Sequence, residues 1–155
     1  MKTSLAVLFT FFLLNACVQN NFDNKSNTTV VFPEIDEAVQ ITMGQKEHFF
    51  ASYYGINSFS KNQKYVTVLQ TDLRYKLPTE KDTATLGLVD IQTKEFIPIA
   101  KTSAWNFQQG CMAHWLATNP DSLIIYNDLR DGEFVSVILN VHSRKEIKII
   151  PYPVS

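Results

Sequence analysis

The C-terminal part of the chain alternates short apolar runs with polar turns. The apolar runs are Leu123–Tyr126, Phe134–Val141 and Ile147–Ile150, and polar stretches at 128–133 and 142–146 separate them. Runs of this length that are rich in β-branched residues and bounded by turn-forming residues are typical of antiparallel strands. The pattern therefore predicts a three-stranded meander.

The preceding part of the chain carries a second copy of this pattern. Residues 86–99 align with residues 136–149 without a gap, which places Asp90 on Asn140 at an offset of 50 residues. A meander that recurs with a period near 50 residues is the sequence pattern of β-propeller blades.

A shorter match extends the repeat upstream. Gln70–Arg74 resembles Tyr126–Arg130 at an offset of 56 residues, and a longer loop at 75–83 absorbs the difference. A catalytic site would not need to be repeated in both copies. The paired aspartates Asp72 and Asp128 are therefore predicted to be structural, with their carboxylates capping turn amides.

These patterns predict an all-β fold. We expect a partial β-propeller of about two four-stranded antiparallel blades, residues 54–102 and 112–151, plus an N-terminal strand at 38–43, within one domain at 38–155. Propellers close with about four to eight blades, so the chain is predicted to be the N-terminal piece of a longer protein or a truncated gene product. A two-sheet β-sandwich acting as a structural module is the alternative, although the unbroken repeat does not favour it. Further strands are predicted at 65–71, 85–91, 95–101 and 112–116.

The first seventeen residues have the pattern of an export signal. A single lysine precedes the uncharged apolar run Leu5–Leu14, which has the length of a signal-peptide helix and falls short of the roughly 20 residues that span a bilayer. The stretch Leu14–Cys17 resembles the lipobox of bacterial lipoproteins, in which the cysteine becomes the lipid-carrying first mature residue. Residues 1–17 are thus predicted to be a lipoprotein signal peptide with Cys17 as the lipidation site. A plain secretory signal with an incidental cysteine is the alternative.

The polar, Asn-rich residues 18–37 are predicted to be a flexible tether between anchor and domain. Lipid chains would hold the mature protein on a membrane without a spanning helix. We therefore expect an exported, membrane-anchored lipoprotein on the outer membrane or the cell surface. The net charge of −1 and the pI near 6.3, with no basic cluster, give no reason to expect a nucleic-acid partner.

The segment from Trp105 to Trp115 is the most chemically varied part of the chain. Within it lie two Trp, two Gln, an Asn, a Cys and a His. In a propeller this segment would cross from the outer strand of one blade to the inner strand of the next, and such crossings line the mouth of the central channel, where ligands usually sit. The aromatic patch at 48–54 is predicted to be mainly β core. The candidate binding residues are Trp105, Asn106, Gln108, Gln109, His114, Trp115, His48 and Tyr54.

Two stretches resemble known propeller families. Residues 59–65, FSKNQKY, resemble the FSPDGKYV hairpin of blades in TolB-like and WD40-like propellers. The glycine of that family is missing here, so Asn62 is predicted to supply the left-handed turn residue. Residues 105–112 resemble a WN(W/F)QQGCM stretch of secreted bacterial propeller proteins related to oligogalacturonate lyases. With similar residues near 41–55, this resemblance covers about Gln40 to the C-terminus.

The resemblance implies a chemistry that the chain carries only in part. The enzymes of that group bind a divalent metal through His and Gln and cleave pectic fragments by β-elimination. His114 and Gln109 are the weak metal candidates here, but a metal site needs three or four convergent ligands, so no cofactor is predicted unless the lyase function holds. Cys111 is predicted to be a buried structural thiol, because His114 would point to the opposite face of a strand.

Besides a structural β-sandwich module, two functions remain open from the sequence. The favoured one is a tethered propeller that binds a glycan or protein partner, without catalysis in this chain. The alternative is an oligogalacturonate-lyase-like, metal-dependent polysaccharide lyase, of which this chain would be the N-terminal part. That enzyme would need a base to remove a proton beside a uronic carboxylate.

Overall fold

The computed structural model describes residues 37–155. The predicted signal peptide, Cys17 and the tether up to residue 36 lie outside the described residues. The compact unit that carries the described strands runs from Ala38 to Ser155. No helix in this part of the chain is long and apolar enough to cross a membrane.

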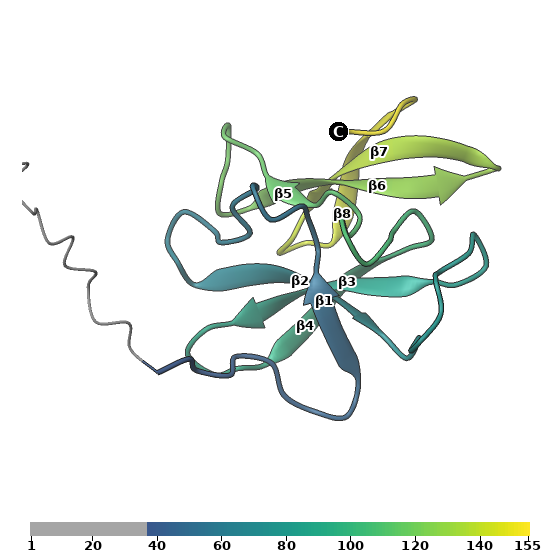
Figure 1. The fold of residues 1–155 in the computed structure, drawn as a ribbon. Coiled ribbons are helices and arrows are strands. Elements are labelled where there is room, and N and C mark those ends of the chain that lie inside the picture. Colours follow the sequence, from purple (N-terminus) through teal and green to yellow (C-terminus); the bar gives the residue numbers. More distant parts are fainter. Residues whose placement is uncertain (1–36) are drawn as a thin grey trace, which may run out of the picture. The chain divides into compact units, whose positions relative to one another are not determined.

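This unit is built from strands that form two four-stranded antiparallel sheets (Figure 1). Each sheet is a simple meander, β1-β2-β3-β4 in sheet 1 and β5-β6-β7-β8 in sheet 2, and the described strands do not cross from one sheet to the other. The predicted all-β fold is confirmed in this form. The strands are β1 (Glu47–Phe50), β2 (Tyr65–Thr71), β3 (Ala84–Asp90), β4 (Phe96–Thr102), β5 (His114–Trp115), β6 (Leu123–Arg130), β7 (Glu133–Asn140) and β8 (Lys145–Ile150).

The turn between the third and fourth strands is the same in both sheets. The side-chain oxygen Oδ1 of Asp90 accepts hydrogen bonds from the backbone N–H groups two and three residues further on, at 2.9 and 3.1 Å. Oδ1 of Asn140 does the same at 3.1 and 3.0 Å. Lys94 and Arg144 then take left-handed backbone conformations, with φ of 61° and 56°. The residues that the predicted offset of 50 aligns, 90–94 and 140–144, therefore form the same Asx-type turn.

The second and third strands also pair in the same register in both sheets. Tyr65 lies opposite Asp90, and Leu123 lies opposite Asn140. Since Asp90 and Asn140 are equivalent, Leu123 is the counterpart of Tyr65, at an offset of 58 rather than the predicted 56. The predicted offset of 56 was wrong because it was based on similar charged residues near the strand ends. The backbone hydrogen bonds between the strands determine which residues correspond.

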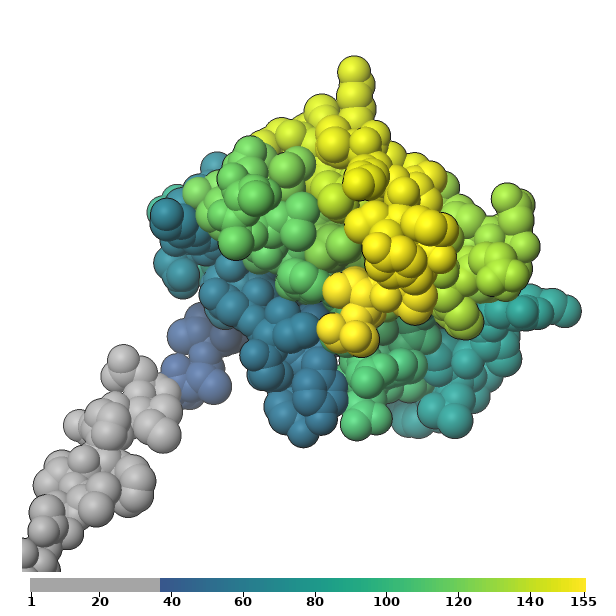
Figure 2. Space-filling model, turned by 90° about the horizontal axis from the view of Figure 1, so that it is seen from above, coloured from purple at the N-terminus to yellow at the C-terminus, as the bar shows by residue number. Residues whose placement is uncertain are grey.

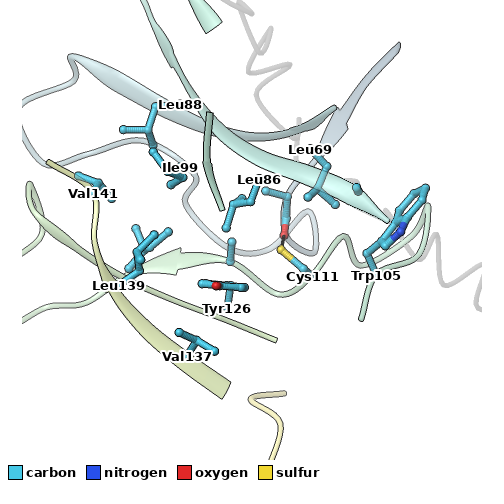
Figure 3. Packing of buried hydrophobic residues seen from close by; sticks show 14 of the residues in the cluster. Leu69, Leu86, Leu88, Ile99, Trp105, Cys111, Tyr126, Val137, Leu139 and Val141 are labelled. Atoms are coloured by element: carbon cyan, nitrogen blue, oxygen red, sulfur yellow. Dashed lines mark hydrogen bonds between the residues drawn. The ribbon is translucent and has the colours of Figure 1, made fainter. Parts of the chain in front are cut away.

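The two sheets use opposite faces to make their common core. We call the front of sheet 1 the face that carries Leu69 and Leu86; by the shared register, the front of sheet 2 carries Asn127 and Ser136. The front of sheet 1 packs on the back of sheet 2 (Figure 3). The sheets are therefore stacked front to back, and burial of these apolar side chains is the main contribution to the stability of the fold. The back of sheet 2 contributes Ile124, Tyr126, Val137 and Leu139 to this core.

The first sheet begins at a different place from the one predicted. Residues 38–43 form no strand, and Ile41 packs against the apolar cluster on the back of sheet 1. The first strand of sheet 1 is β1, which starts at Glu47 instead of near residue 54. Within β1, Phe49 packs against the core, whereas Phe50 is 73% exposed. The predicted aromatic core at 48–54 is therefore only partly buried, because successive strand residues point to opposite faces.

The predicted polar turn at 128–133 is mostly strand. β6 continues to Arg130 and β7 begins at Glu133. Only Asp131 and Gly132 form the turn, with φ of 53° and 83°. Two consecutive left-handed residues, ending in glycine, make the tight hairpin that matches the twist of antiparallel strands.

The buried position of Asp128 corrects its predicted role in turn capping. Its carboxylate accepts a hydrogen bond from Nε of Arg130 at 2.5 Å, and Arg130 also binds Glu146 on β8 at 2.6 Å. Asp72, by contrast, is exposed and pairs with Lys46. The turn-capping role belongs to Asp90 and its counterpart Asn140 instead.

The hairpin at 59–65 forms, but a different residue makes its turn. Gln63, not Asn62, has the left-handed conformation, with φ of 59°. The side-chain oxygen of Asn62 accepts hydrogen bonds from the hydroxyl of Ser60 at 2.8 Å and from the backbone N–H of Lys64 at 3.0 Å. Asn62 thus stabilises the turn by accepting hydrogen bonds. The residue with the left-handed conformation, at the position of the missing glycine, is Gln63.

Candidate functional site

Four connecting segments meet at one end of the two sheets. In an antiparallel meander, the loop after the second strand and the segment after the fourth strand leave from the same end. In sheet 1 these are the β2–β3 loop at 72–83 and the β4–β5 linker at 103–113. In sheet 2 they are the β6–β7 hairpin and the C-terminal segment at 151–155.

These segments border an open pocket of about 350 Å³, which we call the crossover pocket. Its wall combines apolar surface with neutral amides and one carboxylate, and among the described residues that line it none is cationic. The lining residues are Pro78, Thr79 and Glu80 from the β2–β3 loop; Ser103, Ala104, Trp105, Asn106, Gln109, Gly110 and Met112 from the linker; and Asn127, Leu129, Phe134 and Pro153 from sheet 2 and the C-terminal segment.

Trp105 fixes one wall of the pocket. Its side chain is buried, and its indole Nε1 donates a hydrogen bond to the backbone carbonyl of Asp82 at 2.7 Å. The Asp82 carboxylate in turn accepts hydrogen bonds from the hydroxyl and the backbone N–H of Thr79, at 2.7 and 2.9 Å. These two bonds, followed by one from Lys76, hold the pKa of Asp82 below its ordinary value. The loop that carries Thr79 and Glu80 is therefore tied to the linker.

Asn106 shapes the next part of the linker. Its side-chain oxygen accepts hydrogen bonds from the backbone N–H groups of Gln108 and Gln109 at 2.9 and 2.7 Å. Its backbone pairs with that of Gly110 in both directions, at 3.0 Å. This turn places both Asn106 and Gln109 in the lining of the pocket.

Gly110 and Cys111 join the linker to sheet 1. Gly110 has φ of 58°, and a Cβ there would lie 2.3 Å from the backbone carbon of Ala51. The backbone N–H groups of Cys111 and Ala113 donate to the Ala51 carbonyl at 3.1 and 2.9 Å. Glycine is thus required for both its conformation and this close approach. The QQGCM part of the linker has a clear structural task.

Cys111 is a buried thiol, as predicted. Its Sγ lies 3.7 Å from the Ala51 carbonyl oxygen, and burial raises its pKa to about 12. A thiol must ionise to act as a nucleophile or metal ligand. His114 directs Nδ1 toward the Met112 carbonyl at 3.0 Å. The geometry therefore favours a packing role for Cys111.

The eight candidate binding residues separate into three groups. Trp105, Asn106 and Gln109 line the crossover pocket. His48 and Tyr54 line a second cavity, described below. Outside both lie Gln108, His114 and Trp115, of which Trp115 donates a hydrogen bond from Nε1 to the Ser58 carbonyl at 3.0 Å.

The second cavity is an apolar groove of about 560 Å³ lined mainly by residues 48–59 and by strand β2, which we call the aromatic groove. His48 sits in it with its Nε2 3.0 Å from the side-chain amide of Gln70 and its ring edge-on to Phe96. Burial lowers the pKa of His48. The Ser52 hydroxyl also lines the groove and is buried without a hydrogen-bond partner among the described residues.

Metal ligands do not converge in the described part of the chain. Residues 37–155 contain no group of three or more His, Cys, Asp or Glu side chains placed to hold a metal ion. Of the two weak metal candidates, Gln109 lines the crossover pocket and His114 does not.

Sequence reasoning missed most of the crossover pocket, since only Trp105, Asn106 and Gln109 of its lining residues were candidates. The residues missed include Thr79 and Glu80 on the β2–β3 loop, Asn127 and Phe134 on sheet 2, and Pro153. One signal was available, since the loop at 72–83 is unusually long for a β-hairpin and long loops often carry function. The contribution of sheet 2 had no comparable signal, because it depends on how the sheets stack.

Comparison with protein-family models, with curated protein sequences and with solved structures finds no match to this chain. The resemblances to TolB-like, WD40-like and oligogalacturonate-lyase-like propellers, and to bacterial lipoproteins, therefore stay predictions.

Proposed function

We propose that this chain is a β-propeller-type binding module that holds a neutral oligosaccharide in the crossover pocket. The observation that carries the proposal is the pocket itself. It is an open hollow of about 350 Å³ that combines side-chain amides, one carboxylate and an exposed aromatic ring at the loop end of the sheets. Export and lipid anchoring, as expected from residues 1–17, would place such a module where glycans are met.

The stacking of the sheets supports a propeller rather than a sandwich. Each sheet is a complete four-stranded meander, and the linker leaves the outermost strand β4 to enter the innermost strand β5 of the next sheet. Blades arranged around an axis stack front to back, as these sheets do. In β-sandwiches, Greek-key connections commonly carry strands from one sheet to the other, which does not occur among the described strands.

The chemistry of the pocket suits sugar hydroxyls. A side-chain amide such as that of Gln109 can both donate to and accept from a hydroxyl, and the Glu80 carboxylate can accept. Phe134, which is 56% exposed, offers an apolar ring face. Since the described lining has no Lys, Arg or His to balance a uronate carboxylate, a neutral glycan is favoured over a pectic fragment.

The first prediction uses a matched pair of adjacent glutamines. A neutral glycan identified on a glycan array should bind about tenfold more weakly to Gln109→Ala, which corresponds to about 1.4 kcal/mol, because Gln109 lines the pocket. Gln108→Ala should bind as the unaltered chain does, because Gln108 is exposed outside the pocket. Isothermal titration calorimetry measures both.

Two results would contradict the proposal. One is an array without any neutral glycan bound, and the other is equal loss of affinity in the Gln108 and Gln109 variants. Uronate oligomers on the same array provide the comparison for the lyase-related alternative, whose substrates are anionic.

A further inference from the structure

We infer that the aromatic groove is a second binding site, which takes an uncharged, planar aromatic molecule that carries a hydroxyl group. Its volume of about 560 Å³ lies within the range of small-molecule sites in proteins. Among the described residues, none lines both this groove and the crossover pocket. The inference therefore does not depend on what the crossover pocket binds.

Partly exposed aromatic rings line the groove. The side chains of Phe50 and Tyr54 are 73% and 80% exposed, and that of Phe59 is 39% exposed. The Tyr54 ring lies against the Tyr53 ring with centroids 4.0 Å apart, and the Tyr53 hydroxyl donates a hydrogen bond to that of Tyr54 at 2.5 Å. Exposed rings gathered around an apolar hollow are characteristic of binding surfaces. Because aromatic rings pack best in offset-stacked or edge-on pairs, they favour a flat aromatic occupant.

The groove offers no charge to an ionised ligand. Its described lining contains no Asp, Glu, Lys or Arg. Its one imidazole belongs to His48, and because burial lowers the pKa of His48, this ring is neutral at neutral pH. A charge that enters an apolar site without a partner costs free energy. A neutral ligand is therefore favoured over a carboxylate or an amine.

One polar group in the lining lacks a partner. Ser52 is 2% exposed, and its hydroxyl makes no hydrogen bond within the described part of the chain. A buried hydroxyl without a partner is destabilising, because it has lost its hydrogen bonds to water. This hydroxyl can change its direction by rotation about one side-chain bond, and it can both donate and accept. A ligand hydroxyl, which has the same two capacities, would supply the missing hydrogen bond.

The wall of the groove is held in place by hydrogen bonds within the chain. The Ser58 carbonyl accepts hydrogen bonds from the Trp115 indole and from the backbone N–H of Thr67, both at 3.0 Å. The side-chain oxygen of Asn57 accepts one from the backbone N–H of Phe59 at 3.0 Å. A wall that is already ordered lowers the entropic cost of binding, as is usual for small-molecule sites.

The test uses naphthalene derivatives as probes of the full chain, with Cys17→Ser to prevent lipidation. Fluorescence titration should show saturable binding of 2-naphthol, and 2-naphthoate, which is anionic at neutral pH, should bind about tenfold more weakly. Tyr54→Ala should weaken 2-naphthol binding about threefold to tenfold. Tyr152→Ala is the matched control and should not change it, because Tyr152 is 66% exposed and lines neither cavity. The C-terminal residues, which include Tyr152, are in yellow in Figure 2 and lie at the surface.

The variant Ser52→Ala tests the hydrogen bond separately from the aromatic wall. It removes a hydroxyl that has no partner, so thermal unfolding should find it at least as stable as the unaltered chain. It should bind 2-naphthol about fivefold more weakly and naphthalene, which has no hydroxyl, equally well.

Several results would overturn the inference. They are the absence of saturable 2-naphthol binding up to millimolar concentration, equal affinity for 2-naphthol and 2-naphthoate, and equal losses in the Tyr54 and Tyr152 variants. Unchanged 2-naphthol affinity in Ser52→Ala would also contradict it. If Ser52→Ala does not fold, the comparison of Tyr54→Ala with Tyr152→Ala still decides, because both substitutions are at exposed side chains.

Discussion

At the scale of single residues, a few backbone positions carry strict requirements. Gly110 is the clearest, because its left-handed conformation and its contact with the Ala51 backbone act together. Gly132 shares the left-handed conformation but has open space around it, and Gly55 has neither constraint. Substitutions at these three glycines can therefore distinguish the destabilisation caused by backbone strain from that caused by steric crowding.

Replacement of Gly110 by alanine should be strongly destabilising. We expect Gly110→Ala to lower the free energy of unfolding by about 2–4 kcal/mol, because the added Cβ would force the linker away from Ala51. Gly132→Ala should cost about 1 kcal/mol from backbone strain alone, and Gly55→Ala less than about 0.5 kcal/mol. Urea unfolding measures all three, and equal losses at positions 110 and 132 would contradict the crowding argument.

Asp90 should make stability depend on acid pH. Hydrogen bonds from the backbone N–H groups of Thr93 and Gln92, and the charge of Lys64, lower its pKa. Because the folded-state pKa lies below the unfolded one, this stabilisation is present above the unfolded pKa and is lost as the pH falls through the folded pKa, below about pH 4.

The variant Asp90→Asn should remove this pH dependence while keeping the turn. Its counterpart Asn140 makes the same hydrogen bonds without a charge. Urea midpoints measured between neutral and strongly acid pH should therefore fall less steeply than those of the unaltered chain. Asp90→Ala, which loses the acceptor, should be destabilised at every pH. An unchanged acid slope in Asp90→Asn would count against the assignment.

At the scale of elements, an arginine pairs with a strand carboxylate near the end of the second strand in each sheet, but the surroundings differ. In sheet 2, Arg130 links the buried Asp128 to Glu146, and these hydrogen bonds raise the pKa of the guanidinium. Next to sheet 1, Arg74 of the β2–β3 loop pairs with Glu47 of β1, and both side chains are about half exposed. Removing a partner from a buried charge costs far more than breaking a surface pair.

This difference gives a paired prediction. Arg130→Met should lower the free energy of unfolding by about 1–3 kcal/mol, because it leaves the Asp128 carboxylate buried without its partner. Arg74→Met should change it by less than about 1 kcal/mol. Guanidinium chloride would screen these charges, so urea unfolding is the measurement. A larger loss for Arg74→Met would contradict the burial argument.

At the scale of the whole molecule, the two sheets depend on one core. Side chains from both sheets and from the linker belong to the same buried cluster. The two meanders are thus one cooperative unit, even though their strands do not pair with each other. Among the described strands, this front-to-back stacking leaves one face of each sheet without a partner sheet.

A core substitution should therefore affect both sheets together. Leu139→Ala on sheet 2 should cost about 2–4 kcal/mol and shift a single transition. Trp105 packs against sheet 1 and Trp115 belongs to sheet 2, so tryptophan fluorescence and far-ultraviolet circular dichroism should have the same midpoint. Separate midpoints for the two signals would show that the sheets unfold independently.

Local sequence determined the elements that depend on neighbouring residues. The strand at 65–71, the buried thiol at Cys111 and the equivalence of Asp90 with Asn140 were all predicted, because alternation and turn chemistry act over a few residues. The linker joins the last strand of one sheet to the first strand of the next, as expected, and three of its candidate residues, Trp105, Asn106 and Gln109, line the crossover pocket.

Tertiary structure alone decided the register, the stacking and the composition of the pocket. The offset of 58 in β2 and β6 is set by the hydrogen-bond ladder, and burial of Asp128 follows from it. Glu80 and Phe134 meet at the pocket only because the front of one sheet rests on the back of the next. Contacts between residues far apart in the chain leave no periodic trace in sequence, so they follow from packing.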